Sequence, residues 1–148
     1  MIRRLAWSVA GVAAGLVLAL VLLVAVEAFS AVVHPFPPGF GQTPGLTPEQ
    51  QQAELCAHVE RYPAWVLAVV VPMWSLLAGL STSLATRLGG SGSGWVLRMA
   101  LFAAVLSNVA MLPYPGWFRG MAVVGVSLAT FWNGWSISRF VRRESSGT

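Results

Sequence analysis

The sequence has few charged residues, and lysine and aspartate do not occur in it at all. Of its 148 residues only 9% are charged, whereas soluble domains usually carry about 25%. The chain is 56% hydrophobic, with a mean hydropathy of +0.70. Apolar segments of this extent need a bilayer rather than water as their solvent. The composition therefore excludes an ordinary soluble domain and favours an integral membrane protein.

Cysteine and histidine are also scarce. Cys56 is the single cysteine, so no intramolecular disulfide can form, which excludes the thiol–disulfide chemistry of small four-helix membrane oxidoreductases. A zinc site could be drawn from His34, His58, Cys56 and one glutamate, but no HxxxH or CxxC spacing supports it. Neither histidine lies in the middle of a long apolar run, where a haem would need its axial ligand. We therefore expect no metal and no cofactor.

Recognisable catalytic constellations are missing as well. The sequence shows no nucleophile–base pair, no paired carboxylates and no phosphate-binding loop, because the glycine-rich segment 88–94 lacks the lysine of such a loop. This segment is instead expected to be a flexible hairpin. The chain therefore favours a non-enzymatic role.

Four long apolar runs are present, and the arginines are distributed unequally between their ends. The runs cover residues 5–33, 64–86, 95–112 and 117–137, each near the roughly 20 residues that cross a bilayer. Seven of the nine arginines lie at one set of ends: Arg3, Arg4, Arg87, Arg98, Arg139, Arg142 and Arg143. Arginine excess marks cytoplasmic ends.

This asymmetry predicts an all-α bundle of four transmembrane helices in the bacterial inner membrane, with both termini in the cytoplasm. The net charge of +4 follows from the same asymmetry and from anionic lipid headgroups, so the expected partner is the lipid bilayer and not a nucleic acid. The first run could instead be a signal peptide, but its apolar stretch exceeds the usual 7–15 residues or so.

The first outer loop, residues 35–62, contains its own helix signal. Thr47, Pro48 and Gln50 form a capping box with proline at the first helical position. We therefore predict a short amphipathic helix over about residues 48–61, lying on the outer rim of the bundle. The whole chain is expected to form a single membrane domain.

Two stripes of small residues predict close helix packing. Gly11 and Gly15 form a GxxxG in the first run, and Ser75, Gly79 and Ser83 form a second stripe in the next. Small residues let helix backbones approach one another in lipid. We expect them to pack inside the bundle, with a homo-oligomer interface as the alternative.

One group of polar residues is a candidate site. Glu27 is the one ionisable residue well inside an apolar run, and an intramembrane carboxylate is a functional hypothesis by default. Helical phase places Ser30 and His34 beside it. The predicted topology brings Asn108 and Arg119 to the same leaflet, so we expect an outer polar cluster in which Glu27 has a hydrogen-bonding partner. A purely structural role at the interface is favoured over a functional one.

Three segments carry a resemblance to known sequences: VEAFSAVVHPFPPG at 26–39, YPAW at 62–65 and LPYPGW at 112–117. In them the chain resembles a set of small uncharacterised bacterial four-helix integral membrane proteins. The resemblance implies the same architecture and no particular activity. In that set a histidine often follows the helix-one glutamate and another stands between the last two prolines. Here Ser30 and Tyr114 occupy those positions, which weakens metal and proton-relay interpretations.

The function that these observations favour is a structural, accessory or partner-binding membrane bundle. The alternative is a small proton-coupled carrier that uses Glu27 in helix one. The depth and the partner of this carboxylate distinguish the two, because a carrier needs it to face a cavity at mid-depth and a structural role needs it paired at the rim with Arg119.

Overall fold

The computed structural model describes residues 2–40 and 45–145, with side chains up to residue 131. Within these residues the chain forms five α-helices and no β-strand. Their bounds are α1 Ile2–Val33, α2 Pro48–Glu60, α3 Ala64–Gly89, α4 Ser91–Met111 and α5 Gly116–Ser145.

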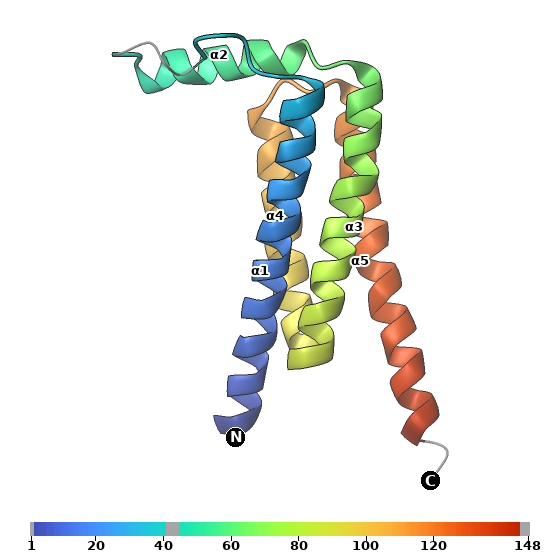
Figure 1. Cartoon of the computed structure of the whole chain (residues 1–148). Helices are drawn as coiled ribbons and strands as arrows, with labels where there is room; N and C mark the ends of the chain where they lie inside the picture. The colour runs from blue at the N-terminus through green and yellow to red at the C-terminus, as the bar shows by residue number, and fades with distance from the viewer. Residues whose placement is uncertain (1, 41–44, 146–148) are drawn as a thin grey trace.

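Four long helices run side by side, and α2 lies across one end of them (Figure 1). The start of α1 and the end of α5 lie at the opposite end (Figure 1). Three helices, α1, α3 and α4, are long and apolar enough to cross a membrane, while the apolar part of α5, Gly116–Phe131, is shorter. The three arginines that follow the fourth run, Arg139, Arg142 and Arg143, lie outside the residues whose side chains the structure describes.

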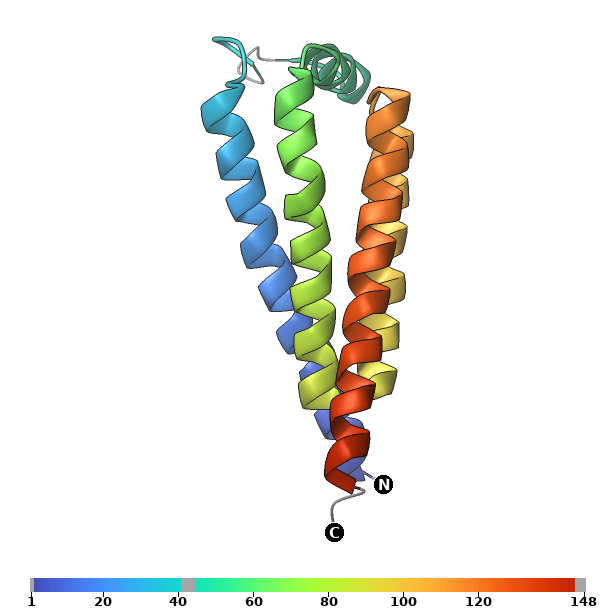
Figure 2. The same ribbon diagram turned by 90° about the vertical axis from the view of Figure 1, so that its right-hand side faces the viewer.

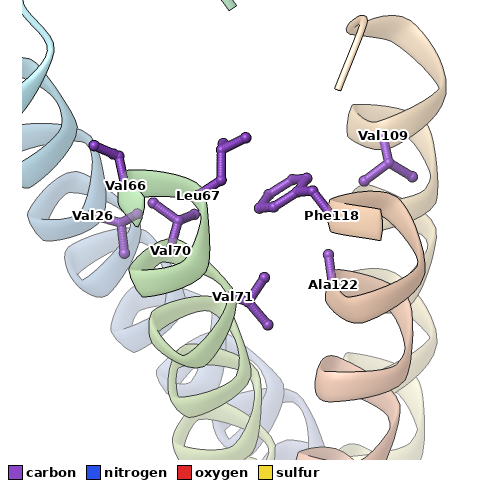
Figure 3. Close-up of a cluster of buried hydrophobic side chains, with 8 residues drawn as sticks. All are labelled: Val26, Val66, Leu67, Val70, Val71, Val109, Phe118 and Ala122. Atoms are coloured by element: carbon purple, nitrogen blue, oxygen red, sulfur yellow. The ribbon is translucent and has the colours of Figure 1, made fainter. Parts of the chain in front are cut away.

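Helix α3 is central to the bundle and packs against α1, α4 and α5. Figure 3 shows the Phe118 ring reaching from α5 towards Leu67 and Val71 of α3. Val26 of α1 completes this apolar core on the other side of α3. The core lies in the half of the bundle nearer to α2. Its buried members are Val26, Val66, Leu67, Val70, Val71, Val109, Phe118 and Ala122.

Helices α1 and α3 approach most closely at the end away from α2, and they spread apart towards it (Figure 2). A Cβ added to Gly11 would lie 2.6 Å from the Cα atom of Gly89, and one added to Gly15 would lie 2.9 Å from the carbonyl oxygen of Ser81. Real Cβ atoms essentially never show either distance. The glycines of the first stripe therefore permit a close backbone contact between α1 and α3.

Hydrogen bonds reinforce the same end of the bundle. The Ser8 hydroxyl donates to the Gly89 carbonyl at 3.1 Å. The Ser93 hydroxyl donates to the carbonyls of Ser8, at 3.1 Å, and Gly89, at 2.8 Å. One small network therefore joins α1, α3 and α4.

The second stripe does not act as a single surface. Ser75 faces α5, since a Cβ on Gly125 would lie 2.6 Å from its hydroxyl oxygen. Gly79 is buried, and its carbonyl accepts a hydrogen bond from the Ser83 hydroxyl at 2.7 Å. The hydroxyls of Ser75 and Ser83 are thus satisfied within α3, as is common for serine inside a helix.

The chain turns back at the predicted hairpin, but the flexible linker expected over 88–94 is wrong. Helix α3 runs to Gly89 and α4 begins at Ser91. Gly90 alone separates them, with φ at +83°, a left-handed conformation that glycine adopts without strain. The Ser93 hydrogen bonds fix the first turn of α4 against α1 and α3, so tertiary contacts override a composition typical of a flexible linker.

Helix α2 begins as the sequence predicts. The Thr47 hydroxyl accepts from the backbone of Gln50, and the Gln50 side chain accepts from the backbone of Thr47, so the predicted capping box is confirmed. The helix ends at Glu60, and its buried residues, His58 and Val59, both lie in its last turn. It is therefore anchored to the bundle by that end.

Arg98 lies inside α4 rather than in a connection. Its guanidinium donates to the Thr130 carbonyl of α5 at 2.7 Å. Its Cζ atom lies 4.6 Å from the Trp95 ring centre and 5.0 Å from that of Phe131, both within cation–π range. This arginine connects α4 to α5.

Candidate functional site

A cavity of about 240 Å³ lies between the bundle and α2. Val26 of α1, Leu67 and Val70 of α3 and the Phe118 ring are core residues that contribute to its apolar wall. Helix α2 contributes Leu55, His58 and Val59 to the wall, so its N-terminal part does not line the cavity. Seven lining side chains carry polar atoms: Glu27, Ser30, His58, Tyr62, Trp74, Asn108 and Tyr114.

The cavity unites three of the five residues of the predicted cluster. Glu27 and Ser30 reach it from α1 and Asn108 reaches it from α4. His34 is not in its wall, although its ring stacks on that of His58, which is. Arg119 is absent from the wall too, since its guanidinium extends to the Leu112 carbonyl at 3.3 Å.

Glu27 does not form the hydrogen bond that the sequence led us to expect. Its side chain is exposed, and no hydrogen bond or ion pair joins its carboxylate to another described residue. The Arg119 guanidinium instead donates a hydrogen bond to the backbone carbonyl of Leu112. The pairing with Arg119 that a structural role at the rim would need is therefore not observed. Glu27 borders the cavity without an ion pair to any cation among the described residues.

Two tyrosines supply hydroxyls to the cavity. Burial, with smaller contributions from Tyr62 and Glu27, raises the pKa of Tyr114 to about 12. Burial also raises the pKa of Tyr62, opposed by a hydrogen bond with the Ser30 side chain and assisted by Glu27. Removal from water disfavours the phenolate, so both tyrosine hydroxyls keep their protons at neutral pH.

His58 is 3% exposed and is held in a stack of rings. Its ring centre lies 4.5 Å from that of His34 and 4.2 Å from that of Phe36, with interplanar angles of 23° and 24°. Tyr62 meets it edge-on at 5.4 Å. Burial, followed by the charges of His34 and Arg61, lowers the pKa of His58. The neutral form of the His58 imidazole is thus favoured. The ring contacts of His58 hold the last turn of α2 against the cavity.

Three residues of the cavity wall hold buried polar atoms that have no hydrogen-bond partner among the described residues. These are Nε2 of His58, Nε1 of Trp74 and Oδ1 of Asn108. A buried polar group without a hydrogen bond costs about 1–3 kcal/mol, and natural proteins rarely leave three in one place. The wall therefore has hydrogen-bonding capacity that a bound molecule could use.

The site does not suit a metal ion. No group of three potential ligands among histidine, cysteine, aspartate and glutamate comes together in the described part of the chain. The two imidazoles are stacked face to face, and their nitrogen lone pairs lie in the ring planes, so they cannot converge on one ion. Cys56 instead lies 3.7 Å from the Gln52 amide nitrogen.

Tyr62 and Trp74 of this site were not predicted from the sequence, and His58 and Tyr114 were considered only as a possible zinc ligand and as the position of a histidine in similar proteins. His58, Tyr62 and Tyr114 lie near the two outer connections, where aromatic residues are common for a different reason. Trp74 lies inside α3, and no sequence signal points to it.

Comparisons of the chain with protein-family models, with curated proteins and with solved structures found no match. The resemblance to small bacterial four-helix membrane proteins therefore stays a prediction. The cavity has to be interpreted from its own chemistry.

Proposed function

We propose that the protein acts by binding rather than by catalysis, and that the cavity beneath α2 is its binding site. The observation that carries this proposal is the set of three unpartnered buried atoms in the wall, on His58, Trp74 and Asn108. A wall of this kind is stabilised when a ligand supplies the missing hydrogen bonds. Concave sites lined mainly by apolar groups with a few polar ones are typical of small-molecule binding.

We further propose that the chain is a four-span protein of the bacterial inner membrane with both termini in the cytoplasm. The arginine asymmetry supports this orientation. The apolar part of α5, Gly116–Phe131, lies beside α3 with its axis along the bundle, as do those of the candidate spans α1, α3 and α4 (Figure 1), which supports a fourth span. In this orientation α2 and the cavity lie on the periplasmic side.

Reporter fusions test the orientation directly. A reporter that is active only in the periplasm should be silent when fused after Thr148 and active when inserted at Gly45, an exposed loop position. Reversed signals would contradict the proposed orientation and would move the cavity to the cytoplasmic side.

A proton-coupled carrier is less well supported. Glu27 borders a cavity, which a carrier requires. It lies only six residues, or about 9 Å, before the end of α1 at Val33, close to the surface that α2 covers. Helices α1 and α3 pack too tightly at the far end, around Gly11, to leave a second access route between them.

Native mass spectrometry of the protein released from membranes tests the binding proposal. We expect the wild type to carry a small-molecule adduct. Asn108→Leu should lose this adduct, because leucine fills part of the cavity and offers no hydrogen bond. Ser107→Leu is the matched control, since Ser107 is the exposed neighbour on the same helix and does not line the cavity. A wild type without an adduct, or an Asn108→Leu variant that keeps it, would refute the proposal.

A further inference from the structure

A second, apolar groove adjoins the cavity between α1, α3 and α4. It has a volume of about 310 Å³ and is lined almost wholly by aliphatic side chains. Four alanines hollow it out: Ala19, Ala78, Ala100 and Ala104. All three helices are candidate membrane spans, so the groove opens towards the acyl chains of the bilayer.

The groove and the cavity share part of their walls. Trp74 and Asn108 line both, and each has one buried polar atom without a partner. The groove and the cavity therefore adjoin at Trp74 and Asn108. At the other end of the groove α1 and α4 come together, because a Cβ on Gly15 would collide with the Leu97 side chain. At that end, Leu16 also lines a further groove between α1 and α4.

We infer that the two spaces together hold one single-chain amphiphile, with its alkyl chain in the groove and an uncharged, hydroxyl-bearing head in the cavity. This inference rests on the proposed function and names its ligand class. The groove follows α4 from Ala100 to Asn108, a rise of about 12 Å. It therefore suits a chain of medium length rather than a whole diacyl lipid.

The hydroxyl head follows from the unpartnered atoms. The indole N–H of Trp74 needs an acceptor, and the amide oxygen of Asn108 needs a donor. A hydroxyl group both accepts and donates, so one such group at the boundary between groove and cavity can satisfy both residues. Tyr62 and Tyr114, which also line the cavity, add further hydroxyl partners.

The charge of the wall excludes an anionic head. Glu27 is the one charged side chain among the described lining residues, and no described cation pairs with it. The lowered pKa of His58 keeps this imidazole neutral. A carboxylate or phosphate head would therefore meet a like charge without a compensating arginine or lysine, and like charges at close range are repulsive.

Photo-crosslinking in nanodiscs tests the inference. The probe is 1-decanoylglycerol with a diazirine in its chain, and its anionic counterpart is decanoate with the same diazirine. We expect the glycerol probe to label the segments of α1 and α4 around Leu20 and Ala104 and to be displaced by unlabelled 1-decanoylglycerol. Decanoate should label them at least about tenfold less, equivalent to about 1.4 kcal/mol.

Two phenylalanine substitutions on α4 distinguish labelling inside the groove from labelling elsewhere on the surface of the bundle. Ala104→Phe fills the groove and should reduce labelling about tenfold. Ala103→Phe should leave labelling unchanged, because Ala103 is equally exposed but does not line the groove. Equal labelling in both variants, or stronger labelling by decanoate, would overturn the inference. A wild type that carries a natural adduct but excludes the glycerol probe would overturn the ligand class alone. A wild type with neither an adduct nor labelling would overturn the binding site itself.

Discussion

Replacing Gly11 by alanine is the sharpest test of how this bundle is held together. The added methyl group would lie 2.6 Å from the Cα and N atoms of Gly89 and 2.8 Å from the Ala85 carbonyl oxygen. These are backbone atoms and cannot rotate away, whereas carbon atoms pack best about 3.5–4.0 Å apart. Helices α1 and α3 must therefore separate by nearly 1 Å, which forfeits about a quarter to a half of each contact nearby.

The expected cost of Gly11→Ala is set by two opposing effects. Overpacking a tight interface costs about 1–3 kcal/mol, and a clash with backbone belongs at the upper end. Alanine recovers about 1 kcal/mol because it is a better helix former than glycine. The net loss is about 2 kcal/mol, or roughly 4–8 °C in melting temperature for a chain of this size.

The matched control is Gly120→Ala on α5. A Cβ at Gly120 meets nothing within 4 Å, so the helix-propensity effect acts alone and stability should be unchanged or slightly raised. Both variants are compared with the wild type by circular dichroism at 222 nm, during heating in mild detergent and during titration with SDS. Equal melting temperatures for the two variants would refute the close α1–α3 contact.

Three further predictions concern other contacts. Ser93→Ala should lower stability by about 0.6 kcal/mol in an SDS titration, since it removes the hydrogen bond to the Ser8 carbonyl and interhelical bonds in membranes average about that value; an unchanged midpoint would contradict the bridge. Arg98→Lys should cost about 1 kcal/mol in the same assay, because lysine loses the planar contact with two rings and the geometry that reaches the Thr130 carbonyl. His58, whose pKa is lowered on folding, binds protons more readily in the unfolded chain, so melting temperature should fall as the pH drops below about 6.5. His58→Phe should flatten that dependence, and a wild type with the same melting temperature at pH 5 and pH 8 would contradict it.

The helix boundaries show where local sequence suffices. The start of α2 could be predicted because Thr47, Pro48 and Gln50 act on their own neighbours. The turn between α3 and α4 could not, because the Ser93 hydroxyl is held by carbonyls from two other helices. A glycine- and serine-rich composition indicates flexibility only when no such partner is near.

The candidate site shows the same division. Ser30 and Glu27 share one helix, so helical phase placed them together. Their proximity to Asn108 on α4 follows from the predicted topology, because successive membrane helices run in opposite directions and this places Asn108 in the same leaflet as Glu27. Phase and topology could not reveal that Arg119 turns to the Leu112 carbonyl, since that depends on the geometry of a single turn.

What the sequence by itself determined is the apolar, helical character of the chain, the three segments long and apolar enough to cross a membrane, and the cap of α2. These depend on composition and on interactions within one turn of helix. Only the tertiary structure decided that the last turn of α2 packs on the bundle. It also decided that His58, Tyr62 and Tyr114 line a cavity over the core, and that alanines of three helices leave an apolar groove beside it. Such features arise from how helices distant in sequence approach one another, and many sequences with the same apolar pattern would pack without them.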